Sequence, residues 1–178
     1  MNFRHYNKSD IRVIVELFAS VFAASEGIAE GELIGGLSKD MFEKTYKKDL
    51  LNFVALDSDK IIGSIFFSRL VFDSDIEAFI LGPVAVHNDY QGKGVGKALI
   101  NFGLDDLKNR GVDIALTYGD PRFYNKVGFY HVSQKTIKAP FDLSQPEGWL
   151  AQSFNEETIK TFTGKCTCVK ALRDPAYW

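Results

Sequence analysis

A glycine-rich segment in the middle of the chain, Gln91-Gly92-Lys93-Gly94-Val95-Gly96-Lys97, has the residue types that bind phosphate groups. Glycines let the backbone approach a ligand closely, and the first turn of a helix exposes amide donors that have no partner inside the helix. The segment lies between an apolar strand pattern, Ala78 to Val86, and a helical pattern, Gly94 to Arg110. This order predicts an anion site at a helix N-terminus, and the alternative is a tight turn without a ligand.

This segment resembles three phosphate-binding motifs to different degrees. A P-loop, G-x-x-x-x-G-K-[ST], fails because Gln91 stands at the first glycine and Ala98 at the hydroxyl position. A Rossmann turn requires G-x-G-x-x-G soon after a first strand, whereas the spacing here is G-x-G-x-G, late in the chain. The pattern Q/R-x-x-G-x-G/A is met at every specified position, by Gln91, Gly94 and Gly96.

This third pattern resembles the acyl-CoA signature of the GNAT N-acetyltransferase superfamily. A second segment, Tyr124 to Phe129, matches the family's Y-x-x-x-G-F. The segments Gly82-Pro83-Val84-Ala85-Val86 and Gly119-Asp120-Pro121, and the tail past Pro140, look like the YhbS-type branch of predicted acetyltransferases. The resemblance covers nearly the whole chain and is least distinctive over Phe3 to Leu50.

The resemblance implies a mixed α/β structure, the GNAT fold, in which a mostly antiparallel sheet splays beside its fourth strand and carries helices on both faces. It also implies acetyl-CoA as the acyl donor, with its pantetheine arm paired to the main chain of Val84 and Val86 and its pyrophosphate held by backbone amides of the loop. Lys93 and Lys97 either add charge there or are solvated surface lysines. The expected coenzyme-binding residues are Val84, Ala85, Val86, Gln91, Gly92, Lys93, Gly94, Val95, Gly96, Lys97 and Asn125.

The chemistry that the resemblance implies is direct attack of an amine on the thioester. The backbone amide of Val84 would stabilise the developing oxyanion, and Tyr124 would protonate the departing thiolate. A lone tyrosine would instead be taken as a core aromatic, and Phe123 is interpreted as packing. The base stays open, because Ile80 stands where many relatives have glutamate. Glu77 is either that base or an ordinary strand-end charge, and a water chain is the other route.

The resemblance therefore implies an N-acetyltransferase that acts on a primary amine of a small molecule or peptide. A non-catalytic acyl-CoA-binding or sensing domain on the same fold is the first alternative, and a structural partner-binding domain is the second. The acceptor cannot be identified from the sequence. Asp73, Asp75 and Glu77 either attract a cationic amine or are simply solvated. A homodimer is left open.

Composition narrows the classes of partner. The chain has 178 residues and a net charge of −2, and the pair Lys47-Lys48, interpreted as a solvated helix end, is its nearest approach to a basic patch, so nucleic acid is not expected. The sequence has neither an apolar stretch of roughly 20 residues nor a signal-like N-terminus, so we expect a cytoplasmic protein without a membrane partner. Cys166 and Cys168 are expected to be reduced thiols, and the cysteines and histidines lack metal-ligand spacing.

The length of 178 residues predicts a single domain over residues 1–178, with residues 140–178 as an extension that holds a helix and a strand. The expected strands are Phe3 to Tyr6, Phe53 to Leu56, Lys60 to Leu70, Ala78 to Val86, Ile114 to Tyr118, Tyr130 to Ala139 and Lys165 to Leu172. The expected helices begin near Ser9 or Asp10, at Lys39, at Gly94, at Asp120-Pro121 and near Trp149. Gly27 to Gly36 is expected to be a mobile loop.

Overall fold

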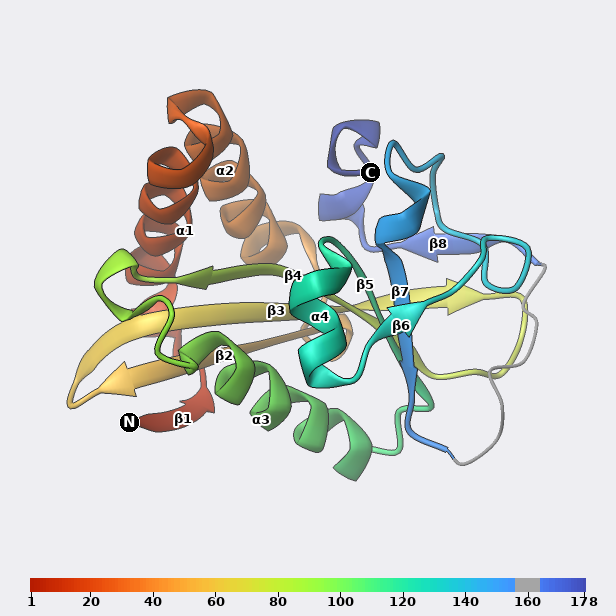
Figure 1. Cartoon of the computed structure of the whole chain (residues 1–178), viewed down its shortest axis with the longest axis horizontal. Coiled ribbons are helices and arrows are strands. Elements are labelled where there is room, and N and C mark those ends of the chain that lie inside the picture. Colours follow the sequence, from red (N-terminus) through yellow and green to blue (C-terminus); the bar gives the residue numbers. More distant parts are fainter. Residues whose placement is uncertain (156–163) are drawn as a thin grey trace. The chain divides into compact units, whose positions relative to one another are not determined.

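The computed structural model of the chain describes residues 1–155 and 164–178 (Figure 1). The helices are α1 (Ile11–Glu26), α2 (Ile28–Lys44), α3 (Val95–Asn109) and α4 (Pro121–Tyr124). The strands are β1 (Asn2–His5), β2 (Leu50–Asp57), β3 (Lys60–Phe72), β4 (Ala78–Val86), β5 (Ile114–Tyr118), β6 (Tyr130–His131), β7 (Trp149–Ser153) and β8 (Cys166–Cys168). The strand order is β1-β2-β3-β4-β5-β7-β6, and β8 pairs with β3.

Strand directions confirm the prediction of a mixed α/β fold. β4 and β5 run parallel, whereas the β1–β2, β3–β8, β5–β7 and β6–β7 pairs are antiparallel. The chain divides into two compact units: unit 1 is Met1–Phe67 with Pro83–Gly103, and unit 2 is Ser68–Gly82 with Leu104–Trp178. The prediction that residues 1–178 form one domain stays a prediction.

In unit 1, alternating residues of β3 contact helices on opposite faces of the sheet. The ring of Phe66 lies 5.4 Å from the ring of Phe18 in α1. Its neighbours Ile65 and Phe67 instead approach Gly103 of α3, where an added Cβ would stand 3.2 and 2.5 Å from their side chains. Because successive side chains of a strand point to opposite faces, this contact pattern puts α1 and α3 on opposite sides of the sheet and explains why β3 is almost continuously apolar.

The expected loop Gly27 to Gly36 is wrong, because this stretch forms the first half of α2. The two helices α1 and α2 lie side by side as a hairpin (Figure 1), and the glycines are part of their interface. A Cβ at Gly31 would stand 2.6 Å from the carbonyl oxygen of Ala19 and 2.6 Å from the Cβ of Ala23, and one at Gly35 would stand 2.9 Å from the Cβ of Ala19. Glycines spaced four apart therefore allow close backbone contact with alanines spaced four apart.

The second predicted helix has different bounds from those expected. It belongs to α2, which ends at Lys44, and the pair Lys47-Lys48 lies instead in a 3-10 turn, Lys47–Asp49, that leads into β2. The hairpin prediction is confirmed, because β2 ends at Asp57 and β3 begins at Lys60, with Ser58 at a φ of +54° in the turn.

Two predictions for segments of unit 2 are wrong. The helix expected near Trp149 is wrong, because Trp149–Ser153 is strand β7, paired with β5 on one side and β6 on the other. Apolar runs this short do not distinguish a buried strand from a helix. The strand expected from Tyr130 to Ala139 is also wrong beyond His131, where a turn begins in which Thr136 N donates to Ser133 O at 2.8 Å.

The end of the chain follows its prediction in part. β8 covers only Cys166–Cys168 of the expected strand, and a 3-10 turn, Lys170–Leu172, follows. Both cysteines are free, in keeping with the prediction of reduced thiols, and both are buried. Burial raises the pKa of the Cys166 thiol to about 12. Trp178 ends the chain with its indole Nε1 donating to Leu172 O at 2.9 Å.

Candidate functional site

The glycine-rich segment of unit 1 is an open loop between β4 and α3. Gly92 and Gly94 have φ values of +72° and +81°, a conformation that other residues adopt only with strain. A Cβ at either position would meet nothing within 4 Å, so backbone conformation rather than crowding requires glycine here. Val95, which is buried, fixes the first turn of α3 to the core. The loop therefore presents bare, accessible backbone at a helix N-terminus.

The side chain of Gln91 holds this loop to the strand before it. Its Nε2 donates to Val86 O at 2.9 Å and to Asn88 Oδ1 at 3.1 Å. The first hydrogen bond into α3 runs from Ala98 N to Gly94 O at 3.0 Å. The amides of residues 95–97 precede that bond, and helix geometry leaves such amides without intrahelical acceptors. Gln91 thus fixes the loop, while the backbone supplies the donors for an anion.

Positively charged lysines lie near the loop, and two of them, Lys60 and Lys93, contact the ring of Tyr90. The ammonium groups of Lys93 and Lys60 lie 5.5 and 5.9 Å from the centre of the Tyr90 ring. Tyr90 donates its hydroxyl hydrogen to Asp57 Oδ2 at 2.8 Å, and this bond raises the pKa of Tyr90. Lys97 is exposed on the first turn of α3. Both lysines named from the sequence, Lys93 and Lys97, are therefore solvent-accessible.

Strand β4 separates from β5 halfway along its length, which confirms the predicted splay. The parallel ladder pairs Ala78 with Ile114 and ends at Leu81 and Thr117, although β4 continues to Val86. Gly82 has a φ of +147° directly before Pro83, which has no amide hydrogen to donate. Beyond this point Val84 and Val86 are half-buried and Ala85 is buried. The end of β4 stays attached to β3, because His87 N donates to Ile62 O at 2.8 Å.

In unit 2, the Tyr124 segment is built by local capping. Asp120 Oδ1 accepts the Arg122 amide hydrogen at 2.9 Å at the start of α4, and Pro121 takes the first position of the helix. Gly128 ends the following 3-10 turn with a φ of +87°. The Tyr124 ring lies across Gly119, where an added Cβ would stand 2.7 Å from its Cε2. The sequence Gly119-Asp120-Pro121 therefore makes room for this ring and begins its helix.

The hydroxyl group of Tyr124 is desolvated, although part of the residue remains exposed. Burial raises the pKa of Tyr124, and a hydrogen bond with the Thr117 side chain partly offsets that rise. Tyr124 therefore stays protonated at neutral pH, as a general acid must. Thr117 was not found by sequence reasoning, because a threonine in a short strand carries no signal of a role.

Two neighbours of Tyr124 have structural contacts of their own. The ring of Phe123 lies 5.1 Å from that of Tyr124, in keeping with its interpretation as packing. With its amide oriented so that the nitrogen faces two backbone carbonyls, Asn125 donates to Pro121 O at 3.1 Å and to Phe129 O at 2.7 Å, which closes the turn after α4. The role of Asn125 toward the coenzyme stays a prediction.

Glu77, the candidate base, lies just before β4 in unit 2 and is already paired. Its carboxylate forms an ion pair with Arg69, and its side chain is 52% exposed. Its backbone amide donates to Asp113 Oδ2 at 2.9 Å. Ile80, at the position where the resemblance implies a glutamate, is buried. Asp73 also has a local partner, because its Oδ2 accepts the Lys165 amide hydrogen at 2.9 Å.

Across residues 1–155 and 164–178, no group of three or more His, Cys, Asp or Glu side chains is arranged to hold a metal ion. In the same ranges, no helix is both long enough and apolar enough to span a bilayer.

Comparison with known proteins supplies a family context for these elements. Residues 48–131 match the family model of the acetyltransferase (GNAT) domain. YjhQ of Escherichia coli K12, described as an uncharacterised N-acetyltransferase, is 29% identical over 168 residues, which cover 91% of this chain and 88% of YjhQ. YhbS of the same strain, described likewise, is 34% identical over 106 residues, which cover 58% of this chain and 60% of YhbS.

Solved structures share the fold. The E. coli YhbS structure in complex with CoA has a TM-score of 0.79 at 24% identity, covering 97% of this chain and 92% of the other. A GNAT acetyltransferase from Brucella melitensis in complex with acetyl-CoA has a TM-score of 0.70 at 22% identity, with 96% of each chain covered. These likenesses confirm the predicted fold class.

Proposed function

We propose that this chain is a GNAT-type acetyltransferase that transfers an acetyl group from acetyl-CoA to a primary amine by direct attack on the thioester; the match of residues 48–131 to the acetyltransferase (GNAT) domain and the similarity to YjhQ support the proposal. The observation that carries the proposal is the loop at the start of α3. Bare backbone at Gly92 and Gly94, together with helix amides that lack acceptors, supplies donors suited to a pyrophosphate. The CoA and acetyl-CoA complexes of structural neighbours support the same donor.

The splayed half of β4 suits the rest of the coenzyme. Val84 and Val86 lie beyond the last paired residue, Leu81, and so have main-chain groups that the β5 ladder does not use. An extended pantetheine arm pairs with these groups as an added strand would. The Val84 amide donates to the oxyanion that forms on the thioester carbon. This interaction strengthens as negative charge develops, so it lowers the barrier rather than only binding the substrate.

Tyr124 completes the reaction by protonating the thiolate that leaves. Its raised pKa keeps the proton on its hydroxyl at neutral pH, so it is ready to act as an acid. The amine must lose a proton before or during attack, and water carries that proton away, because Glu77 is held by Arg69. The acceptor is a small-molecule or peptide amine.

Calorimetry with acetyl-CoA tests the proposal, and the chain offers a matched pair of glycine variants. Gly94→Glu places bulk and negative charge in the loop and should abolish binding. Gly111→Glu is the control, because Gly111, after α3, has a similar φ of +77° and similar open space around a Cβ. Wild type and the control should each gain about 2.7 kcal/mol of stability at a hundredfold excess of acetyl-CoA over its Kd.

A panel of amines, monitored for release of free thiol, then separates an enzyme from a sensor. Thiol release with at least one amine is the expected result. Binding with no release across the panel would favour the non-catalytic acyl-CoA sensor. Absence of binding to the wild type would overturn both.

A further inference from the structure

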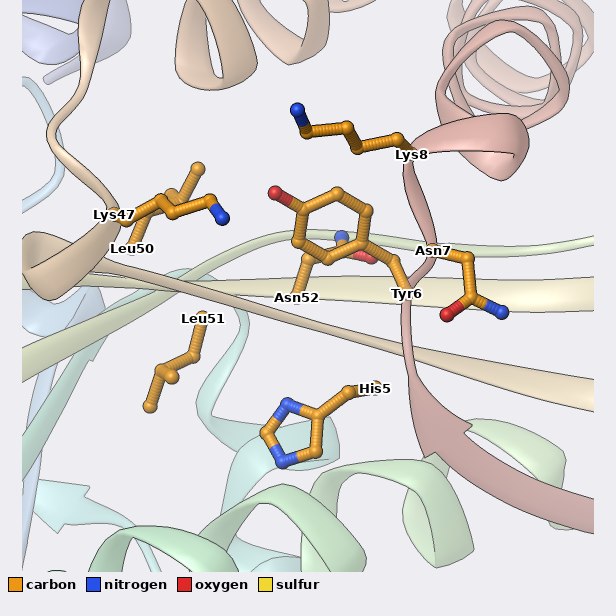
Figure 2. Close-up of a pocket in the computed structure, with 8 residues that line it drawn as sticks. All are labelled: His5, Tyr6, Asn7, Lys8, Lys47, Leu50, Leu51 and Asn52. Atoms are coloured by element: carbon orange, nitrogen blue, oxygen red, sulfur yellow. The ribbon is translucent and has the colours of Figure 1, made fainter.

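A hollow in unit 1, at the ends of β1 and β2, contains none of the residues assigned to acetyl-CoA (Figure 2). It has a volume of about 310 Å³ and is open to solvent. That volume is near the lower end of the range found for small-molecule sites, roughly 300–1,000 Å³. Its lining residues are His5, Tyr6, Asn7, Lys8, Lys47, Leu50, Leu51 and Asn52.

Tyr6 and Asn52, which form one wall of the hollow, are held in place by contacts with neighbouring residues. The Tyr6 ring lies 4.9 Å from the ring of Phe42, and Tyr6 N donates to Asn52 O at 3.1 Å. Asn52 is fully buried, and its Nδ2 donates to Ser64 Oγ and to Ile65 O, both at 2.9 Å. A ligand would therefore meet a preformed surface, which lowers the entropy cost of binding.

The hollow carries positive charge that no carboxylate in its lining offsets. In Figure 2 the ammonium groups of Lys8 and Lys47 and the hydroxyl group of Tyr6 point into the same space. Neither lysine has an ion-pair partner among residues 1–155 and 164–178. The nearby Asp10 is held elsewhere, because it pairs with Arg4 at 2.7 Å and accepts the Asn7 amide hydrogen at 2.6 Å. The hydrogen bond from Arg4 lowers the pKa of Asp10, so its charge is fixed on that pair.

We propose that this hollow is a binding site for a small organic anion. The oxyanion group, a carboxylate or a phosphate, lies between Lys8 and Lys47 and accepts the Tyr6 hydroxyl hydrogen. Charge-assisted hydrogen bonds of this kind are the strong ones in protein sites. The apolar part of the ligand lies against Leu50 and Leu51, which contribute apolar surface to the same hollow. The lysine at the start of the pair Lys47-Lys48 thus has a role beyond a solvated turn.

Backbone amide NMR of the full chain tests the site with three small probes: benzoate, phenyl phosphate and the neutral benzamide. Saturable shifts at Tyr6, Lys8, Lys47 and Leu51 are expected with at least one anion and not with benzamide. Comparing the affinities of benzoate and phenyl phosphate tells whether the site prefers a carboxylate or a phosphate. Titrations run with and without acetyl-CoA keep this result separate from the proposed function, because phosphate binding at residues 91–97 would shift other amides.

A matched pair of double variants removes the same charge in two places. The double variant Lys8→Gln/Lys47→Gln should bind the anion with an affinity at least about tenfold lower, a loss of about 1.4 kcal/mol of binding free energy. Lys135→Gln with Lys138→Gln, two exposed lysines of unit 2, should leave its affinity unchanged. Added salt should also weaken binding of the anion to the wild type, and this test requires no variant. The proposal is overturned if neither anion gives saturable shifts in the hollow, or if those shifts survive in the Lys8/Lys47 variant.

Discussion

The hydroxyl group of Thr117 donates a hydrogen bond to the carbonyl oxygen of Leu81 at 3.0 Å, across the last pair of the β4–β5 ladder. Thr117 is fully buried, and its side chain also interacts with the hydroxyl group of Tyr124. A hydroxyl has one hydrogen to give, so the hydrogen that Thr117 donates to Leu81 O is not available to the Tyr124 oxygen at the same time. One buried oxygen therefore links the point where β4 leaves the sheet to the proposed acid.

Replacing Thr117 separates this link from simple packing. Thr117→Val keeps the shape but leaves the Leu81 carbonyl without its donor, which should cost about 1–3 kcal/mol of unfolding free energy in urea titrations. It should also lower kcat, because Tyr124 loses its partner. Thr117→Ser restores the hydroxyl and should recover most of kcat. A valine variant with the turnover of the wild type would show that Thr117 does not orient Tyr124.

Removing the Tyr124 hydroxyl tests its proposed role as the acid. Tyr124→Phe should keep acetyl-CoA affinity while lowering kcat by roughly 10²–10⁴-fold, the usual worth of a general acid. Phe123→Leu is the control, because Phe123 neighbours Tyr124 without a proton to donate. Steady-state rates with an identified acceptor supply the measurement. Unchanged turnover in Tyr124→Phe, where chemistry limits the rate, would remove Tyr124 from the mechanism.

The raised pKa of Tyr124 also gives the protein a pH signature at the alkaline end. Its folded pKa lies above its unfolded value near 10, so the neutral form is favoured by folding. The contribution of Tyr124 to the free energy of unfolding is fully present below about pH 10, and it is lost as the pH rises through the folded pKa. The difference in unfolding free energy between wild type and Tyr124→Phe should therefore narrow or change sign above pH 10.

Two glycines of α2 should respond in opposite ways to the same substitution. Gly31→Ala puts a Cβ 2.6 Å from the backbone oxygen of Ala19 and should destabilise the fold by about 1–3 kcal/mol through overpacking. Gly36→Ala meets nothing within 4 Å on the same helix and should stabilise it by about 0.4–1 kcal/mol. Urea denaturation of both variants measures the difference. Equal effects would mean that α1 and α2 are not in close contact at Gly31.

These glycines also show what the sequence could not reveal. Gly27 to Gly36 was expected to be a loop because glycine lowers helix propensity. The reason for Gly31 and Gly35 is a contact with Ala19 and Ala23 on another helix, and a local pattern carries no record of it. The tail failed similarly, since Trp149–Ser153 is a strand because β5 and β6 flank it. Tertiary partners outweighed local preference in both places.

Local signals were sufficient where the chain itself sets the geometry. The hairpin turn after Asp57, the loop at Gly92 and Gly94, and the helix start at Asp120-Pro121 each follow from residues within a few positions of one another. The splay of β4 was implied by family resemblance, and Pro83 gave it a physical reason. Thr117 and the lysine-lined hollow require knowledge of side chains brought together from distant segments.

Glu77 provides the sharpest test of how the amine loses its proton. An alkyl amine with a pKa near 10 is mostly protonated at pH 7, so the rate should rise with pH as the free amine fraction grows. A dedicated carboxylate base must be within hydrogen-bond reach of the amine, whereas the Glu77 carboxylate forms an ion pair with Arg69. Glu77 lies before the first residue of β4, three positions away from Ile80, where the resemblance implies the base.

Glu77→Gln should therefore cost less than about tenfold in kcat/KM, or about 1.4 kcal/mol of barrier. Its matched control is Glu16→Gln on α1, which also removes an exposed carboxylate from a pair with an arginine, Arg12. Exposed ion pairs are worth about 0–1 kcal/mol, so both variants should fold normally. A loss of a thousandfold or more in Glu77→Gln alone, with acetyl-CoA affinity intact, would make Glu77 the base. Water would then have no part in accepting the proton, and the Arg69 ion pair would have to open during turnover.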